Sequence, residues 1–140
     1  MAEKSGEVVW IDRLRFLGQA GSGHSIVFDV PSAESPAGMS PMEAALLAMA
    51  GCTAVDIVEI MRKKRQNLIG LRVRISGQQA PEPPNVYTDI AVEYILTGRN
   101  LSEAAVKHAI ELSETKYCSV GAMLSKTARV HSTYRIIEAE

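Results

Sequence analysis

The pattern of hydrophobic and polar positions along this chain predicts five strands and three helices. The strands are expected at residues 7–17, 25–30, 71–76, 86–96 and 128–137. The alternation is cleanest from Leu71 to Ser76, as in a half-buried strand. The first two strands flank a glycine-rich turn, residues 18–23, and so predict an N-terminal hairpin.

The clearest helix signal begins at Ser40, which can cap the helix. Pro41 fits the first helical position, and Glu43 stands where its carboxylate completes a capping box. The helix is predicted to run from about 41 to 66. Its first half, residues 44–52, is apolar on every face, which is typical of a helix buried on all sides. We therefore expect a long central helix wrapped by a sheet and by a second subunit.

Two shorter helices complete the pattern. Ser102 is predicted to cap one, and Cys118 lies near the start of a short piece that ends around Ser125. The order β-β-α-β-β-α-α-β belongs to the α+β fold class. At this length we expect one domain over residues 1–140.

Composition narrows the choice of partners. The net charge of −1 gives no electrostatic footprint for nucleic acid or for an anionic membrane. The basic cluster 62–65 closes the long helix, where cations meet the negative end of the helix dipole. We interpret it as a solvated helix end, with an anion or partner site as the alternative.

The sequence points to the cytoplasm. We find no stretch that approaches the ~18 apolar residues of a membrane span, and residues 1–7 are polar, unlike a signal peptide. In that compartment the chain's two cysteines stay reduced unless they cycle in a reaction. A permanent structural disulfide is the less favoured interpretation.

Cys52 and Cys118 are the residues most able to carry chemistry, although either can also be a small buried hydrophobe. Gly51 beside Cys52 costs its helix about 1 kcal/mol relative to alanine, which indicates a packing or access role. Asp56, four residues after Cys52, is interpreted as capping or pairing with a neighbouring segment. Cys118, near a helix start and Lys116, is predicted to have the more electropositive surroundings.

The sequence contains no motif typical of a metal or phosphate site. His24, His108 and His131 lie in no CxxC-like, HExxH-like or carboxylate-paired spacing, so we predict no metal site. The glycine-rich turn leads into a strand and not into a helix, so it cannot cradle a phosphate as a P-loop does.

With both cysteines placed, the chain resembles the OsmC/Ohr family. The resemblance lies in the hairpin, in Ser40-Pro41-Met42-Glu43-Ala44 leading to Ala50-Gly51-Cys52, and in Lys116-Tyr117-Cys118-Ser119-Val120 before the last strand. It implies an intertwined homodimer that reduces organic hydroperoxides with two thiols. Cys52 matches the peroxidatic cysteine, which becomes a sulfenic acid, and Cys118 the resolving cysteine, which condenses with it to a disulfide. A dithiol such as a dihydrolipoyl group then restores both thiols, and no bound cofactor is expected.

Two departures from the family's hydroperoxide reductases affect the support for Cys52. Their glutamate directly follows the proline, where this chain has Met42, and Glu43 comes one residue later, about 100° farther round the helix. Their thiolate-stabilising arginine lies in the first hairpin, whose expected turn, residues 18–23, has none. Arg13 and Arg15, earlier in the chain, are the candidates to replace it. These departures place the chain nearer the broader OsmC-like branch.

The sequence thus yields two functional hypotheses of different classes. The first is a cysteine-based hydroperoxide reductase in oxidative stress defence, with Cys52 and Cys118 as the thiols and with Glu43, Arg13 and Arg15 as supports. The alternative is a redox-sensing or hydrophobic-ligand-binding dimer without enzymatic turnover. A purely structural dimer would instead have thiols that neither oxidise nor titrate below about 8.

Overall fold

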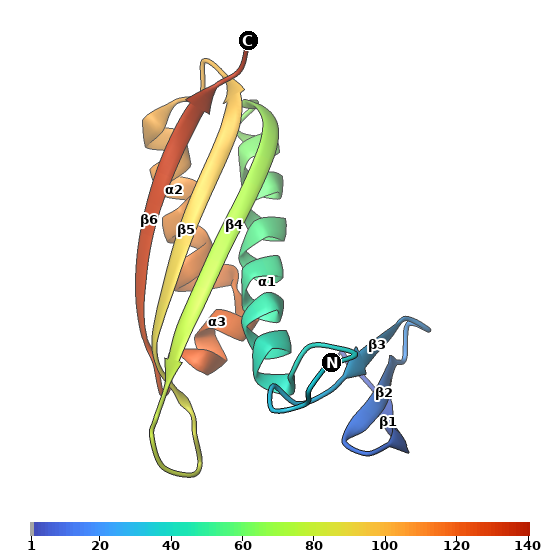
Figure 1. Cartoon of the computed structure of the whole chain (residues 1–140). Helices are drawn as coiled ribbons and strands as arrows, with labels where there is room; N and C mark the ends of the chain where they lie inside the picture. Colours follow the sequence, from blue (N-terminus) through green and yellow to red (C-terminus); the bar gives the residue numbers. More distant parts are fainter. Residues whose placement is uncertain (1) are drawn as a thin grey trace. The chain divides into compact units, whose positions relative to one another are not determined.

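The computed structural model describes residues 2–140 and divides into two compact units, one ending at Ala45 and the other running from Leu46 to Glu140 (Figure 1). The elements are β1 (Gly6–Asp12), β2 (Arg15–Ala20), β3 (Ser25–Phe28), α1 (Pro41–Lys63), β4 (Asn67–Gln79), β5 (Tyr87–Arg99), α2 (Glu103–Leu112), the π-helical turn η1 (Ser113–Tyr117), α3 (Ser119–Leu124) and β6 (Arg129–Glu138). The first turn of α1 belongs to the first unit and the rest of that helix to the second.

The first unit is an antiparallel sheet in the order β1-β2-β3. The single strand expected over residues 7–17 is wrong, because the chain reverses after Asp12. Arg13 adopts a positive φ of 46°, and its carbonyl accepts a 2.8 Å hydrogen bond from the indole Nε1 of Trp10. An ion pair of 2.8 Å between Asp12 and Arg15 closes the same turn. Side-chain bonds therefore stabilise a turn that neither glycine nor proline marks.

The glycine-rich segment is consequently the second hairpin turn, between β2 and β3. Gly18 lies within β2, and the chain reverses near Gly23, whose φ of 89° would strain any residue with a Cβ. The strand expected over residues 25–30 is confirmed in its first four residues as β3.

The second unit is a three-stranded sheet with β5 in the middle, antiparallel to β4 and parallel to β6. A parallel pair needs a long crossover connection, which α2, η1 and α3 supply. Figure 1 shows α1 and this connection on the same face of the sheet. The predicted cap of α2 is confirmed, because the Ser102 side chain accepts a hydrogen bond from the backbone N–H of Ala105.

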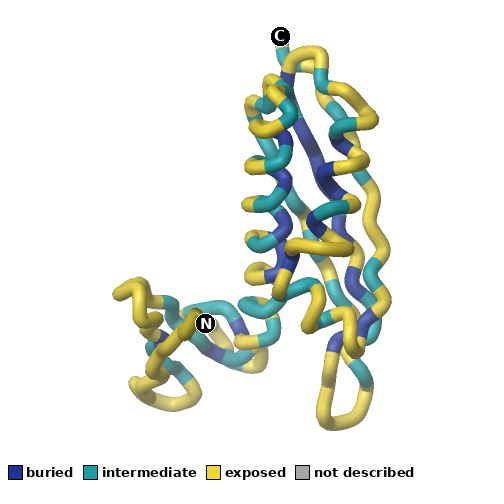
Figure 2. Tube along the Cα trace, turned by 180° about the vertical axis from the view of Figure 1, so that it is seen from behind, coloured by how far each residue is buried: buried dark blue, intermediate teal, exposed yellow. Residues whose placement is uncertain are grey.

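The core of the second unit lies between this sheet face and the helices. Ile57 and Met61 of α1, Tyr94 and Leu96 of β5, and Val106 of α2 are fully buried. Figure 2 shows the buried positions following the inward side of α1 and the central strand. Cys118, on the crossover connection, therefore lies close to the buried side of α1.

The long helix ends three residues earlier than expected, at Lys63. Arg65 adopts a left-handed φ of 55°, and the backbone N–H of Gln66 bonds to the carbonyl of Met61 across 3.0 Å. Helices usually end this way on glycine. An arginine in that position gives no such signal in the sequence.

One apolar stripe of α1 is uncovered in the single chain. Leu47 is 54% and Val55 60% exposed, whereas the opposite side packs in the core. The 23-residue helix is also long and apolar enough to cross a membrane by length and composition, so our expectation that no segment qualifies is wrong. A core helix passes the same test, and the buried side of α1 is the core of this unit. The second subunit expected over the stripe stays a prediction.

Candidate functional site

Cys52 and Cys118 meet in the second unit. Cys52 lies half-buried on α1, and Cys118, 4% exposed, precedes α3 on the crossover connection. Both are free thiols, and Cys52 is near enough to act on the pKa of Cys118. The fold thus brings together two cysteines that stand 66 positions apart in the sequence.

Cys118 is fixed by its backbone and by its sulfur. Its N–H donates across 2.8 Å to the carbonyl of Ser113, five residues earlier, which closes the π-helical turn η1. Its Sγ accepts a 3.2 Å hydrogen bond from the N–H of Gly121 in the first turn of α3. Single π-helical turns are often found at functional sites, and this one aims a thiol at α1.

The charge environment of Cys118 differs from our expectation. Burial, followed by the contact with Cys52, raises the pKa of the Cys118 thiol to about 11, while the Gly121 N–H acts in the opposite direction. The Lys116 ammonium lies 5.2 Å from the ring centroid of Tyr117 in a cation–π contact. The prediction that Cys118 has the thiolate-favouring surroundings is wrong, because desolvation outweighs the helix N-terminus.

Asp56 ties α1 to the turn that carries Cys118. Its Oδ2 accepts a hydrogen bond of 2.9 Å from the hydroxyl of Ser113, whose side chain is fully buried. The interpretation of Asp56 as pairing with a neighbouring segment is confirmed. The negative charge of the Asp56 carboxylate is also among the causes that raise the pKa of Cys118, after burial and the effect of Cys52.

A second polar chain secures the same turn to the sheet. The hydroxyl of Tyr94 on β5 donates across 2.7 Å to Oε2 of Glu114, and Ser132 on β6 donates across 3.1 Å to Oε1. Burial, followed by the bond to Glu114, raises the pKa of Tyr94. Thr53, next to Cys52, also hydrogen-bonds Tyr94. No local sequence signal marks this chain, because it joins residues of four separate elements.

A cavity of about 330 Å³ opens beside the thiol-bearing face of α1. Its walls come from α1, α2 and η1 and mix apolar with charged side chains, namely Asp56, Glu59, Ile60, Lys63, Lys64, His108, Leu112 and Tyr117. Asp56 is four residues from Cys52 on the same helical face. Two residues of the basic cluster, Lys63 and Lys64, line this cavity.

Glu43, the predicted supporting acid, lies in the first unit. Its carboxylate accepts a 2.9 Å hydrogen bond from the backbone N–H of Ser40, and its own N–H donates across 3.1 Å to the Ser40 hydroxyl. The predicted capping box is confirmed. A role of Glu43 at the thiols stays a prediction.

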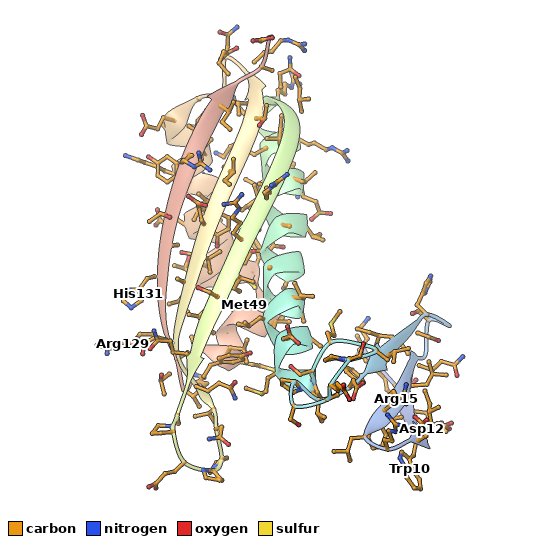
Figure 3. The ribbon with its side chains drawn as sticks, in the orientation of Figure 1. Trp10, Asp12, Arg15, Met49, Arg129 and His131 are labelled. Carbon is orange, nitrogen blue, oxygen red and sulfur yellow. The ribbon has the colours of Figure 1, made fainter. Side chains whose placement is uncertain are left out.

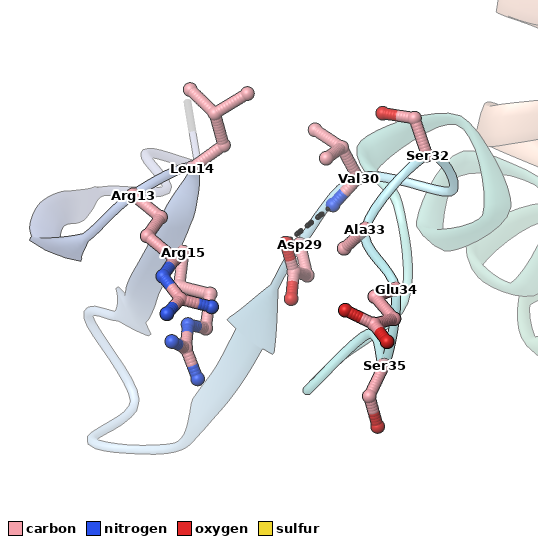
Figure 4. Close-up of a pocket in the computed structure, with 9 residues that line it drawn as sticks. All are labelled: Arg13, Leu14, Arg15, Asp29, Val30, Ser32, Ala33, Glu34 and Ser35. Atoms are coloured by element: carbon pink, nitrogen blue, oxygen red, sulfur yellow. Dashed lines mark hydrogen bonds between the residues drawn. The ribbon is translucent and has the colours of Figure 1, made fainter.

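Arg13 and Arg15 share a cavity of about 430 Å³ in the first unit (Figure 4). Asp29 and Glu34 line the same cavity. Backbone N–H groups of Ala37 and then Val30 hold the pKa of the Asp29 carboxyl below its usual value, with smaller contributions from the two arginines. The first hairpin turn contains Arg13 and is flanked by Arg15, so the expectation of an arginine-free first turn is wrong.

The histidines lie apart. His131 points outward from β6 beside Arg129 (Figure 3), and its Nε2 is 3.7 Å from Asp89. His24 hydrogen-bonds Ser22 across 3.2 Å. Within residues 2–140, no three side chains of the metal-binding types gather in one place.

Comparison with known proteins decides the family. The family model described as OsmC-like protein matches residues 33–133. The chain belongs to the OsmC-like family. It is 40% identical over 132 residues to protein YhfA of Escherichia coli K12, covering 94% of this chain and 97% of YhfA.

Solved structures of OsmC-like and related proteins have the same mixed α+β fold. A hypothetical protein from Aquifex aeolicus is 27% identical, with full coverage of both chains and a TM-score of 0.89. The organic hydroperoxide resistance protein OsmC of Legionella pneumophila has a TM-score of 0.74 over 96% of this chain and 97% of that chain. At 11% identity the latter shows the OsmC-like fold alone.

Proposed function

We propose that this OsmC-like protein reduces organic hydroperoxides with its two cysteines. The Cys52 thiolate attacks the O–O bond, releases the alcohol after protonation, and becomes a sulfenic acid. The Cys118 thiol then attacks that sulfur, forming the Cys52–Cys118 disulfide and releasing water. An external dithiol returns both residues to thiols, which fits a reducing compartment such as the cytoplasm.

The contact between the two thiols carries this proposal. A disulfide-forming step needs two sulfurs that approach without backbone movement, and here Cys52 is near enough to Cys118 to raise the pKa of its thiol. Cys52 is the more accessible of the two, and Cys118 is the buried partner. This difference in exposure suits Cys52 as the thiol that reacts with the peroxide and Cys118 as the thiol that reacts with the resulting sulfenic acid. The solved Legionella pneumophila protein that shares the fold is named an organic hydroperoxide resistance protein.

We further propose that the working form is a homodimer. The apolar stripe of α1 and the exposed apolar residues of β1, which include Val8, Trp10 and Ile11, are large unpartnered surfaces in one chain. Contiguous apolar patches of this kind mark interfaces. Cys52 is adjacent to the stripe, so a second copy would complete the apolar surroundings of the peroxide.

The decisive experiment treats the reduced protein with one equivalent of cumene hydroperoxide and follows free thiols by intact mass. We expect rapid loss of both thiols with a decrease of two hydrogens. The Cys52→Ser variant should leave the peroxide intact, whereas Cys118→Ser should stop at a sulfenic acid that dimedone traps. Full peroxide consumption by Cys52→Ser would overturn the assignment.

The ligand-binding alternative rests on the cavity beside Asp56, which is large enough for a small molecule. Persistence of both thiols, together with a co-purified hydrophobic compound, would favour it. Fast turnover in a ligand-free protein would remove it.

A further inference from the structure

We propose that Asp56 and Ser113 form a positioning pair that holds Cys118 near Cys52 for disulfide formation. This role rests on the proposed function, because it concerns the second step of that reaction. Neither residue touches the peroxide.

The geometry forms a continuous chain from one thiol to the other. Asp56 follows Cys52 by four residues on α1, so both project from one helical face. The Ser113 hydroxyl donates to Asp56 across 2.9 Å, and the Ser113 carbonyl accepts from the N–H of Cys118 across 2.8 Å. One fully buried serine thus connects the helix of the first thiol to the backbone of the second.

The side chains of η1 have different hydrogen-bond partners, and the Ser113 side chain bonds to α1. Thr115, two residues later, donates its hydroxyl to the carbonyl of Glu111 across 2.7 Å, inside its own helical segment. Glu114 connects the turn to β5 and β6 instead. Two hydrogen bonds reach the helix that bears Cys52: the Ser113 hydroxyl bonds to Asp56, and the Sγ of Cys118, directly after the turn, donates to the carbonyl of Met49 across 4.0 Å.

The carboxylate has a second effect, which is electrostatic. A negative charge near a thiol disfavours the thiolate, and Asp56 acts on Cys118 in this sense. A protonated Cys118 brings its hydrogen to the reaction. The thiolate is the attacking form of a cysteine, so the Cys118 proton passes to the departing hydroxyl to give water as the Cys118 sulfur bonds to the Cys52 sulfur and the S–OH bond breaks.

The other groups around Cys118 are few. From α1 it faces Cys52 and the Met49 carbonyl, which accepts from its Sγ across 4.0 Å, and it faces Tyr94 from β5 and the Gly121 N–H from α3. The charged side chains that share a cavity with Asp56 are Glu59, Lys63, Lys64 and His108. Of these side chains, Asp56 is the one that bonds to Ser113. Replacing it by asparagine removes its charge and keeps an oxygen that can accept the Ser113 hydrogen bond.

The test separates charge from hydrogen bond with two variants. Asp56→Asn keeps an oxygen that accepts from Ser113 but removes the charge. Ser113→Ala keeps the charge but removes the bond, and Thr115→Ala is the matched control. Folding of each is checked by circular dichroism. Disulfide formation is driven with diamide, which oxidises two thiols without any peroxide, and the pH profile of Cys118 alkylation is recorded in a Cys52→Ser background.

We expect Ser113→Ala to slow formation of the Cys52–Cys118 disulfide by about ten- to a hundredfold, as for other small displacements of reacting groups, with the alkylation profile unchanged. Asp56→Asn should move that profile to lower pH, by up to about one unit. Thr115→Ala should change neither readout.

Equal disulfide rates in Ser113→Ala and Thr115→Ala would overturn the positioning role, and an unmoved profile in Asp56→Asn would overturn the electrostatic one. Because diamide replaces the peroxide, a protein that forms the disulfide in this Ser113-dependent way yet ignores hydroperoxides would refute the proposed function while supporting the positioning pair.

Discussion

Ser40 and Glu43 exchange two hydrogen bonds across the first turn of α1, from each backbone N–H to the other's side chain. Both carboxylate and hydroxyl are thereby committed to the helix start. Glu43, which stands one position later than the glutamate of the hydroperoxide reductases, therefore has a structural role as part of the helix cap.

Removing that carboxylate should cost stability more than activity. We expect Glu43→Ala to lower the free energy of unfolding by about 1 kcal/mol, since a helix cap is lost, with an unchanged alkylation rate at Cys52. Urea unfolding and iodoacetamide kinetics measure the two quantities. Glu59→Ala, farther along the same helix, is the control. Slower peroxide reduction at unchanged stability would instead give Glu43 a role at the thiols.

The first hairpin turn offers a test of the expected arginine support. If Arg13 or Arg15 stabilises the Cys52 thiolate, its replacement by alanine should lower the rate of peroxide reduction at pH 7 by about tenfold. Because Arg15 also pairs with Asp12, Asp12→Asn controls for loss of that ion pair. Unchanged alkylation profiles in both arginine variants would place the support elsewhere.

Stability should fall in alkaline solution through Cys118. The folded-state pKa of this thiol is raised from 9.0 to about 11, so between these values the unfolded chain releases a proton that the folded chain keeps. The contribution of this thiol to the free energy of unfolding is fully present below pH 9. It is lost as the pH rises through 11, because the unfolded chain ionises the thiol at lower pH than the folded chain. Urea unfolding should show a steeper decline over this interval in the reduced protein than in Cys118→Ala. Parallel declines would show that another group is responsible.

Gly51 offers a test of the proposed dimer. A Cβ at this position meets nothing within 4 Å in the chain, so Gly51→Ala should stabilise the isolated helix by about 1 kcal/mol. Gly51→Trp should leave the fold intact but dissociate a dimer that packs on this face. Sedimentation measures the outcome, with Lys107→Trp on α2 as the surface control. A dimer unaffected by the tryptophan must use another surface.

Much of the fold was readable because the relevant signals are local. Alternation identified β4, β5 and β6, and the caps at Ser40 and Ser102 are residues whose side chains act within three positions. The turn at Arg13 escaped detection because an indole, a carboxylate and a guanidinium close it together. No pattern of turn-forming residues encodes such an arrangement.

The site was harder to predict because its chemistry depends on burial. A helix start and a nearby lysine indicated a thiolate at Cys118, but the sequence does not show how far the sulfur is desolvated. That the two cysteines meet came from the family resemblance, since nothing in their spacing implies contact. Ser113 gave no signal, because a serine after a helix is an ordinary helix end.

The π-helical turn η1 sets the direction of Cys118 by the number of residues that it contains. One residue fewer would restore an ordinary α-helical turn and rotate everything after it by about 100°, carrying the sulfur away from α1. Insertions and deletions within Ser113–Tyr117 should therefore abolish thiol pairing, whereas substitutions there leave the number of residues unchanged. Among OsmC-like chains with two cysteines, the length of this segment should distinguish paired thiols from separate ones.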